Sequence, residues 1–255
     1  MSHFRFSGVS VSAPDTDAPE PTSPARTHAV RDREILAPFD LEITEARVVV
    51  LGPNGSGKST FLRLLNGLTL PSAGTVTVDG MDTATQIRDV RRTVGFLFTD
   101  PLSQLVMPIV REDVELSLKT SIKNSTARRT AAIEALAALG VDHLSERSVY
   151  DLSGGERQLV ALVSVLAAGQ RVLVADEPNT LLDLRNTLRL RQIFRSLEQQ
   201  IIFATHDLDF AADAERALVF DGGTIVYDGA PPGGIAAYRA LCSIEASRGE
   251  GLDAR

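Results

Sequence analysis

The feature that most constrains this chain is a glycine-rich segment, residues 52–60, that directly follows an apolar run. Residues 47–51 read Arg-Val-Val-Val-Leu and predict a buried strand, and residues 52–60 match the pattern Gly-x4-Gly-Lys-Ser completely. Glycines let the backbone curl so that its N–H groups point inward at phosphate oxygens, and the following helix N-terminus adds to the attraction. We therefore interpret the segment as a phosphate loop rather than a chance glycine-rich turn.

Two side chains of this loop have specific predicted contacts. Lys58 should reach the β and γ phosphates of ATP, which makes it a catalytic candidate, and the hydroxyl group of Ser59 should ligate Mg²⁺. This ion neutralises charge that develops on the transferred phosphoryl group. The predicted nucleotide-binding residues of the loop are Gly52, Pro53, Asn54, Gly55, Ser56, Gly57, Lys58, Ser59 and Thr60.

A second motif is a pair of acidic residues at the end of another apolar run, residues 172–175. Asp176 and Glu177 follow it directly, at the carboxyl end of a predicted strand, where ligands collect in open α/β sheets. By itself, Asp-Glu-Pro at a strand end is simply a turn. Downstream of a phosphate loop, we expect Asp176 to bind Mg²⁺ through water and Glu177 to polarise the water that attacks the γ-phosphate.

Composition limits the classes of protein that this chain can belong to. At 255 residues and 44% hydrophobic, it can bury one sizeable core, so we expect a single domain over residues 1–255. The 33 acidic residues exceed the 26 basic ones, which argues against nucleic acid as a partner. Its longest mostly apolar run is too short to span a bilayer, and the single cysteine, Cys242, fits a reducing cytoplasm.

The order of predicted elements favours an α/β fold with a mostly parallel sheet. Apolar runs at residues 93–98, 172–175, 201–204 and 217–220 alternate with helical patterns. Residues 4–11 alternate like an edge strand that residues 39–43 could partner, and residues 75–80 resemble one arm of a hairpin. We expect a helical subdomain at about residues 101–160 and an exposed Pro-rich loop at residues 13–31.

One further motif turns these features into a resemblance to a known family. Residues 152–156, here called the signature segment, read Leu-Ser-Gly-Gly-Glu; alone this is also an ordinary helix N-cap with a capping-box acid. Between a phosphate loop and an Asp-Glu pair, it resembles the ATP-binding-cassette (ABC) ATPases over about residues 40–230. The resemblance implies an α/β P-loop NTPase (ABC ATPase) core with an antiparallel β subdomain and a helical subdomain.

The resemblance also implies roles for residues outside the phosphate loop. In the family, the signature segment contacts the γ-phosphate held by another protomer, so Ser153, Gly154 and Gly155 would act in a nucleotide-sandwich dimer. Asp183 matches the acid of the family's D-loop and also suits a helix N-cap. His206, which follows the run at residues 201–205, matches the switch histidine that senses γ-phosphate and orients Glu177 and water.

The chain departs from the family pattern at two places. Thr99 replaces the glutamine that usually follows the strand at residues 93–98, so either Thr99 or Gln104 would take part in binding the metal; Gln104 could instead belong to the surface that meets a membrane subunit. The aromatic residue that usually stacks on adenine is missing near residues 11–13. Stacking would then be weak or supplied by another residue such as Phe39.

Residues 98–114 resemble the ATPases of energy-coupling-factor importers, and with residues 181–186 they are most similar to those of bacterial biotin importers. The resemblance implies an ATP hydrolase coupled to transport, peripheral at the cytoplasmic face of the cell membrane. Its partners would be an integral coupling subunit, a substrate-binding membrane subunit and a second ATPase protomer, identical or paralogous. Alternative cargoes are another vitamin or cobalt/nickel.

Two other classes of function compete with transport. A soluble P-loop kinase would have no use for the signature segment. A nucleic-acid-linked ABC ATPase would require a basic face, and the chromosome-organising and repair relatives separate their cassette halves by long coiled coils. The 95 residues from Lys58 to Ser153 carry no long heptad pattern, so we favour a transporter.

Overall fold

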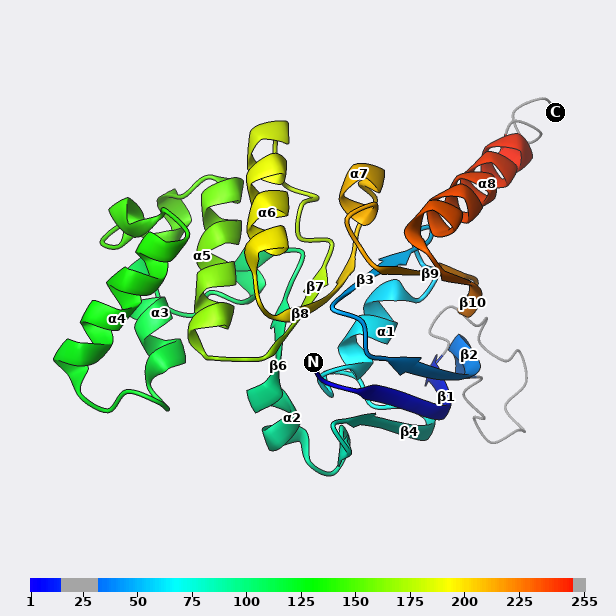
Figure 1. Ribbon diagram of the computed structural model, residues 1–255, viewed down its shortest axis with the longest axis horizontal. Coiled ribbons are helices and arrows are strands. Elements are labelled where there is room, and N and C mark those ends of the chain that lie inside the picture. The colour runs from blue at the N-terminus through cyan, green and yellow to red at the C-terminus, as the bar shows by residue number, and fades with distance from the viewer. Residues whose placement is uncertain (15–31, 250–255) are drawn as a thin grey trace, which may run out of the picture.

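The computed structural model describes residues 1–14 and 32–249 (Figure 1). Its centre is a six-stranded sheet of strand order β10-β9-β3-β8-β7-β6, parallel from β9 to β6 and antiparallel between β9 and β10. Strands β7 and β8 are buried along their whole length, which is why they read as continuous apolar runs. The six strands are β3 (Arg47–Leu51), β6 (Val94–Leu97), β7 (Val172–Asp176), β8 (Gln200–Ala204), β9 (Arg216–Asp221) and β10 (Thr224–Gly229).

A second sheet is antiparallel, with strand order β2-β1-β4-β5. Its strands are β1 (Phe4–Pro14), β2 (Asp32–Ile43), β4 (Ala73–Val78) and β5 (Met81–Asp82). The prediction that residues 4–11 form an edge strand was wrong, because β1 pairs with β2 on one side and with β4 on the other. The alternation of buried and exposed residues in β1 reports one covered face of the sheet, and this pattern is the same for an interior strand.

The predicted loop at residues 13–31 is only partly covered by the structure. Ala13 and Pro14 extend β1 and pair with Arg33 and Asp32 of β2. The remainder of that prediction, residues 15–31, lies outside the described residues.

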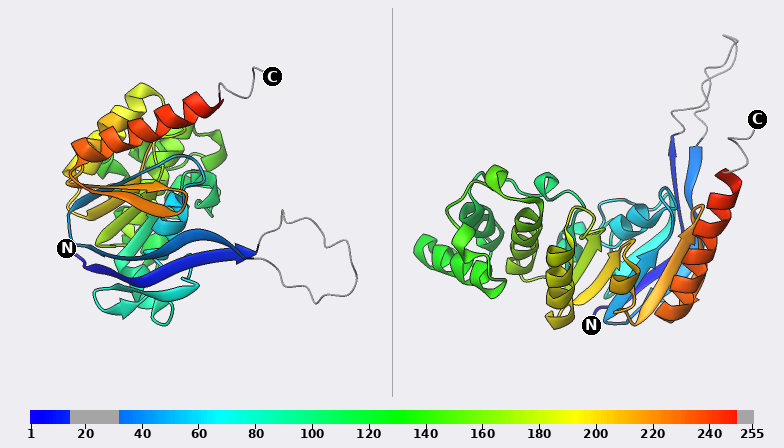
Figure 2. Two further views of the ribbon diagram at one scale, coloured as in Figure 1. Left: turned by 90° about the vertical axis from the view of Figure 1, so that its right-hand side faces the viewer. Right: turned by 90° about the horizontal axis from the view of Figure 1, so that it is seen from above.

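Helix α1 (Lys58–Leu64) lies between the two sheets, as the side views show (Figure 2). Phe61 of α1 is fully buried, and its ring centroid lies 5.2 Å from that of Phe6 in β1 and 5.1 Å from that of Phe220 in β9. These contacts join the antiparallel sheet to the central sheet through one helix. Because α1 begins at the end of the phosphate loop, the same packing holds the loop in place.

The helices between β6 and β7 form a lobe at one end of the molecule (Figure 1). They are η1 (Pro101–Ser103), α3 (Val110–Leu118), α4 (Ser125–Ala138), η2 (Asp142–Leu144), η3 (Val149–Asp151) and α5 (Gly154–Ala167). The expected helical subdomain at about residues 101–160 covers most of this lobe, but α5 runs seven residues beyond it, to Ala167. Residues 161–167 continue the helix because α5 leaves the lobe and packs on the face of the central sheet.

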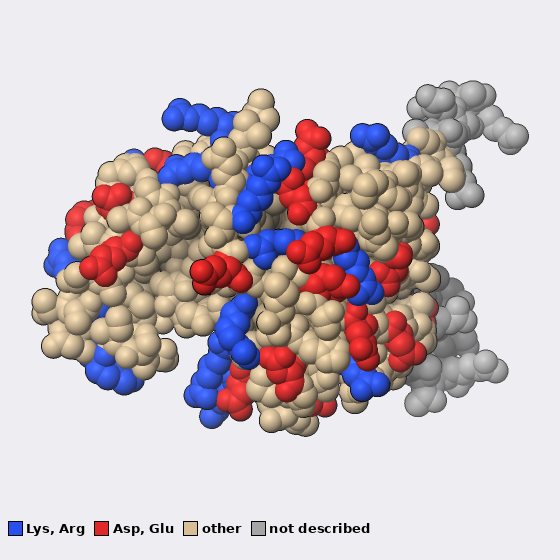
Figure 3. Space-filling view, in the orientation of Figure 1, with Lys and Arg blue, Asp and Glu red and all other residues tan. Residues whose placement is uncertain are grey.

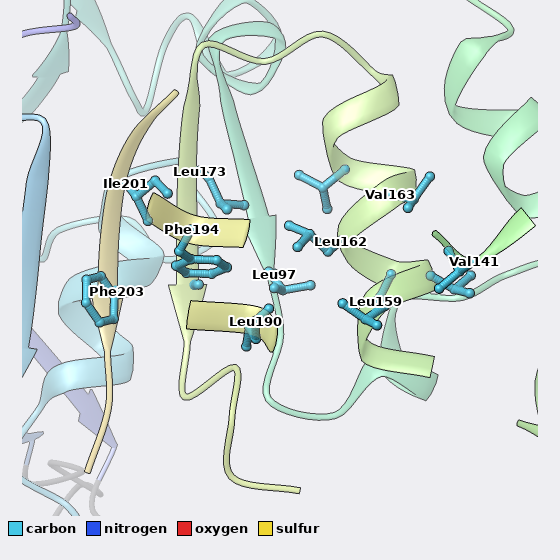
Figure 4. Close-up of a cluster of buried hydrophobic side chains, with 14 of the residues drawn as sticks. Leu97, Val141, Leu159, Leu162, Val163, Leu173, Leu190, Phe194, Ile201 and Phe203 are labelled. Atoms are coloured by element: carbon cyan, nitrogen blue, oxygen red, sulfur yellow. The ribbon is translucent and has the colours of Figure 1, made fainter. Parts of the chain in front are cut away.

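One face of the central sheet is covered by α5 and α6 (Leu184–Ser196) (Figure 4). Val163 of α5 points away from the sheet, toward Val141, whereas Leu162 of α5 and Leu190 and Phe194 of α6 point toward the strands. Their partners from the sheet include Leu97, Leu173, Ile201 and Phe203. This core fixes the carboxyl ends of β7 and β8 relative to the start of α5.

The remaining helices are α2 (Ile87–Thr93), α7 (Leu208–Ala211) and α8 (Pro231–Gly249), the last of which packs along β9 and β10 (Figure 2). Acidic and basic side chains alternate over the middle of the face shown in Figure 3. Among the described helices, none is both long enough and apolar enough to cross a bilayer.

Candidate active site

The phosphate loop takes the conformation that its glycines predict. Gly57, the residue before α1, has a φ of 102°, and a side chain on it would lie 2.5 Å from Leu36 of β2. Lys58 is 5% exposed, and its ammonium group donates to the carbonyl oxygens of Gly52 (2.7 Å) and Pro53 (2.9 Å). Burial lowers the pKa of Lys58, while the nearby carboxylates of Glu177 and Asp176 oppose that shift.

Ser59 and Asp176 meet where α1 begins and β7 ends. The Ser59 hydroxyl group donates to Oδ1 of Asp176 over 3.0 Å. Asp176 is 4% exposed, and burial raises the pKa of its carboxyl group against the hydrogen bond from Ser59. A hydroxyl oxygen beside a desolvated carboxylate is an oxygen donor set suited to Mg²⁺, which prefers one or two protein ligands together with phosphate and water.

Glu177 adopts a backbone conformation that is rare for a residue with a side chain. Its φ is 48°, and its amide N–H donates to the carbonyl oxygen of Ala204 at the end of β8 (3.2 Å). Oε2 accepts a hydrogen bond from the Thr180 hydroxyl group (3.0 Å), and Oε1 lies 3.9 Å from Nζ of Lys58. The left-handed turn therefore directs the carboxylate toward the phosphate loop, away from the line of β7.

His206 stands beside this carboxylate. Its Nε2 lies 2.7 Å from Oε1 of Glu177, and its Nδ1 lies 2.9 Å from the hydroxyl oxygen of Tyr238 in α8. The loop that carries His206 is tied to the loop after Glu177, because Thr205 donates to the side-chain oxygen of Asn179 (2.9 Å). Sequence reasoning missed Tyr238, because it belongs to no motif and the pattern of its helix does not indicate a contact with His206.

The signature segment caps helix α5. Ser153 and Glu156 form a capping box, in which Oγ of Ser153 accepts from the Glu156 amide (3.3 Å) and the Glu156 carboxylate accepts from the Ser153 amide (2.8 Å). Ser153 is exposed, whereas Gly155 is buried against Asn186, and a side chain on Gly155 would lie 2.6 Å from Nδ2 of Asn186. The capping interpretation of these letters is thus correct, and a hydroxyl group and a helix N-terminus face outward.

Asp183 caps helix α6, in agreement with the predicted helix N-cap, which was one of the two roles considered for this residue. Its carboxylate accepts from the Asn186 amide over 2.8 Å. The carbonyl oxygen of Leu181 would lie 3.3 Å from a side chain on Gly154, so the segment before α6 packs against the signature segment. The exposed side chain of Leu181 continues this surface.

The two candidates for the missing glutamine occupy different positions. Oγ1 of Thr99 donates to the backbone carbonyl of Asp176 (2.8 Å), which places it beside the Ser59–Asp176 pair. The Gln104 amide accepts from the Phe98 amide and donates to the carbonyl of Ala161 (both 3.3 Å), so it links β6 to α5. Of the two candidates, Thr99 is therefore the one beside the Ser59–Asp176 pair, whereas the side-chain oxygen and nitrogen of Gln104 are both engaged in these links.

Gln104 lies instead in a groove of about 330 Å³ between the helical lobe and the sheet. Phe98, Leu116 and Val165 contribute apolar walls to it. The carboxylate of Asp113 shapes the segment beside this groove, accepting from the amides of Val106 and Met107 and from the Ser164 hydroxyl group.

The phosphate loop opens into a pocket of about 500 Å³, here called the nucleotide pocket. The described residues that line it are Ala13, Pro14, Arg33, Glu34, Ile35, Asn54, Gly55, Gly57, Lys58, Ser59, Thr60, Glu177, Gly222 and Gly223. Phe39 is not among them: its ring lies 5.4 Å from Phe6 and 6.2 Å from Phe61, in the core beneath β2. The suggestion that Phe39 stacks on adenine was therefore wrong.

The predicted site residues thus fall into two groups in space. Lys58, Ser59 and Glu177 line the nucleotide pocket, with Asp176 bonded to Ser59 and His206 in contact with Glu177. Ser153, Gly154 and Gly155 are not among the described residues that line it.

Comparison with known proteins gives a consistent set of matches. The family model described as ABC transporter matches residues 36–180. A putative ABC transporter ATP-binding protein of Bartonella quintana, BQ02700, is 43% identical over 205 residues, which cover 80% of this chain and 91% of that protein. The biotin transport ATP-binding protein BioM of Rhizobium etli is 43% identical over 212 residues, which cover 83% of this chain and 94% of that protein.

Solved structures share the fold. CbiO1 of Clostridium perfringens, described as part of the ABC transporter complex cbiONQ, has a TM-score of 0.75 at 24% identity and covers 95% of this chain and 94% of its own. The cassette MJ0796, described as dimeric in a post-hydrolysis state bound to ADP and Pi, has a TM-score of 0.76 at 25% identity and covers 89% of this chain and 98% of its own.

Proposed function

Because this chain belongs to the ABC transporter family of ATPases, we propose that it powers an importer of the energy-coupling-factor type that takes up biotin. ATP hydrolysis coupled to transport is the activity of the family. The observation that carries the proposal is the convergence of Lys58, Ser59 and Glu177 on one pocket, with His206 held against Glu177.

The nucleotide pocket would hold the triphosphate of ATP against the phosphate loop. Lys58 now donates to two carbonyl oxygens of its own loop, and a phosphate would offer its ammonium group stronger, charged acceptors. Ser59 and Asp176 would hold Mg²⁺, with Thr99 adjacent to them through the Asp176 backbone. The bound ion would supply positive charge that offsets the cost of keeping Asp176 ionised while buried.

Glu177 is the proposed general base. Its carboxylate lies at the wall of the nucleotide pocket and is held by hydrogen bonds from Thr180 and by His206. A carboxylate fixed in this way can accept a proton from water as that water attacks phosphorus. His206 would keep the carboxylate in line and donate from Nε2 toward the γ-phosphate when ATP is bound.

We propose that a second ATPase protomer completes each site. Ser153 is exposed at the N-terminus of α5, where its hydroxyl group and the adjacent amides can meet an anion. Because the signature segment does not line its own nucleotide pocket, a partner's pocket is where it would act. The description of the MJ0796 cassette as dimeric supports the same arrangement.

The wall opposite the phosphate loop would contact the base of the nucleotide. It contains Pro14 at the end of β1 and Arg33 and Ile35 on β2, and no described aromatic side chain lines the pocket. A planar guanidinium group can stack on a π face. We therefore assign Arg33 to the adenine, in the place where relatives use an aromatic ring.

The partners in the membrane would be a coupling subunit and a substrate-binding subunit. The groove between the helical lobe and the sheet offers an apolar surface for the coupling subunit, and the exposed side chains of Leu68, Leu116 and Val106 lie along it. Gln104 at its floor links this surface to β6, which ends beside Thr99. These contacts would place the chain peripherally at the cytoplasmic face of the membrane.

Biotin is the cargo that similarity to BioM supports. The test is to co-express this chain with the integral membrane proteins that co-purify with it and to measure uptake of labelled biotin in vesicles or cells. ATP-dependent biotin uptake that is lost in a Lys58→Ala variant would support the proposal. Uptake of a different vitamin or of a metal ion, with no biotin uptake, would keep the ATPase and overturn the cargo.

A further inference from the structure

We infer that Tyr238, on the C-terminal helix α8, is a positioning residue that fixes the tautomer of His206 and so aims its Nε2–H at the reacting groups. The inference rests on the proposed function for the role of His206. Tyr238 itself lies outside the phosphate loop, the signature segment and the other sequence motifs of the site.

The geometry places His206 between two fixed partners. Nδ1 of His206 lies 2.9 Å from the hydroxyl oxygen of Tyr238, and Nε2 lies 2.7 Å from Oε1 of Glu177. Tyr238 is 9% exposed and belongs to the core that underlies α5 to α8. Both ring nitrogens of His206 are therefore engaged at hydrogen-bonding distance from side chains on different elements.

These two contacts select one neutral form of the imidazole. A carboxylate oxygen is a hydrogen-bond acceptor, so in a neutral ring the hydrogen on this side belongs to Nε2 of His206. In the neutral ring Nδ1 is then an acceptor, and the Tyr238 hydroxyl group donates to it. The same tautomer presents an N–H group where the γ-phosphate of ATP would lie, and the other tautomer would present a lone pair.

Helix α8 is seated closely enough to make Tyr238 a fixed donor. A side chain on Gly234, in the first turns of α8, would lie 2.6 Å from Cβ of Ala217 in β9. A side chain on Gly233 would lie 2.2 Å from the hydroxyl oxygen of Tyr227 in β10. Two small residues thus let the helix lie directly on β9 and β10, and Tyr238 follows one turn later on this anchored segment.

A purely structural role would predict a different outcome from a tautomer-setting role. If Tyr238 only packed in the hydrophobic core, its ring would contribute to stability, and its hydroxyl group would not affect which nitrogen of His206 carries the hydrogen. Removal of the hydroxyl group alone separates the two, and Tyr238→Phe makes that change with the ring retained.

The first experiment is nitrogen-15 NMR of the imidazole groups in the full chain without nucleotide. The chain has four histidines, and a His206→Asn variant assigns the signal of the fourth. We expect the Nε2–H tautomer for His206 in the wild type and a mixture with the Nδ1–H tautomer in Tyr238→Phe. A wild-type signal of the Nδ1–H tautomer would overturn the inference even if the variant failed to fold.

The second experiment is steady-state ATP hydrolysis by the same proteins. We expect Tyr238→Phe to lower kcat by about 3- to 10-fold, the range for one lost neutral hydrogen bond, and to change the KM for ATP less than 2-fold. An unchanged kcat, or a lowered kcat with an unchanged tautomer, would overturn the inference. Failure of the wild type to hydrolyse ATP would instead contradict the proposed function, and the NMR result would stand apart from it.

Tyr227→Phe is the matched control. Tyr227 is also a tyrosine beside α8, and its hydroxyl group donates to the carbonyl oxygen of Ala230 over 2.9 Å. The hydroxyl group next to Nδ1 of His206 belongs to Tyr238 and not to Tyr227. The control should leave the His206 signal and kcat unchanged, so a general effect of removing a hydroxyl group near α8 would be recognised.

Discussion

Nε2 of His206 lies 2.7 Å from Oε1 of Glu177, although the two residues follow different strands of the central sheet. The sheet register explains the contact, because β7 and β8 are adjacent and parallel and Asp176 pairs with Ala204 at their carboxyl ends. Each strand delivers its next residues to the same edge. The left-handed conformation of Glu177 then turns its carboxylate to the histidine.

This contact predicts a hydrolysis-deficient protein that still binds ATP. Glu177→Gln removes the proposed proton acceptor but keeps the shape of the side chain, so hydrolysis should fall by about 100-fold or more. ATP should then hold the protein as a dimer, which size-exclusion chromatography with ATP and Mg²⁺ would detect. Glu198→Gln, at an exposed position outside the pocket, should behave as the wild type. Undiminished turnover in Glu177→Gln would refute the assignment.

The buried carboxyl group of Asp176 predicts a conflict between stability and function. Burial raises its pKa above the ordinary value, so the ionised form costs the folded state free energy at every pH above that raised pKa. Asp176→Asn should therefore raise the Tm of the nucleotide-free protein at neutral pH. The advantage should shrink as pH falls through the raised pKa, because the native carboxyl group then takes up its proton.

The same substitution should abolish stabilisation by ATP with Mg²⁺, because a ligand of the ion is lost. Differential scanning fluorimetry over a pH series, with and without the nucleotide, measures both effects. Asp142→Asn, an exposed aspartate of η2, serves as the control and should show neither. A lower Tm for Asp176→Asn at neutral pH would contradict the account.

The position of Arg33 in the nucleotide pocket predicts that its removal weakens ATP binding without slowing hydrolysis. Arg33→Ala should raise the KM for ATP by about 3- to 10-fold, as expected for loss of one cation–π contact, and leave kcat unchanged. The control is Arg5→Ala on the neighbouring strand β1, where the guanidinium group pairs with Glu42 and is remote from the pocket lining. An unchanged KM in Arg33→Ala would show that the base lies elsewhere.

Local motifs were predictable because a few adjacent residues determine each geometry. The phosphate loop, the start of α1 at Lys58 and the cap at Ser153 depend on glycines and hydroxyl groups within one turn. The strands ending at Asp176 and before His206 are buried on both faces, so their apolar runs were unambiguous. The antiparallel sheet was harder, since alternation in β1 does not distinguish an edge strand from an interior one.

Contacts between distant segments were the part that the sequence could not supply. Arg33 reaches the nucleotide pocket because β2 pairs with β1, and Tyr238 reaches His206 because α8 lies along β9. The choice between Thr99 and Gln104 stayed open for the same reason: the partners of Gln104, Phe98 and Ala161, are set by how α5 docks on β6. Such pairs depend on tertiary packing, which no short pattern encodes.

The central claim is that each hydrolytic site takes its phosphate loop from one protomer and its signature segment from another. Two variants separate these halves: Lys58→Ala disables the loop, and Ser153→Asp places a negative charge where the γ-phosphate would be met while retaining a helix-capping side chain. Each variant alone should be nearly inactive. A mixed dimer of the two, however, contains one site with an intact loop and an intact signature segment.

The most direct measurement is therefore ATP hydrolysis by an equimolar mixture of the two inactive variants, with mixed dimers verified through two affinity tags. We expect recovery to as much as about a quarter of the wild-type rate, since random pairing makes half of the dimers mixed and each carries one intact site of two. No recovery in verified mixed dimers, or full activity in strictly monomeric wild-type protein, would contradict the shared site.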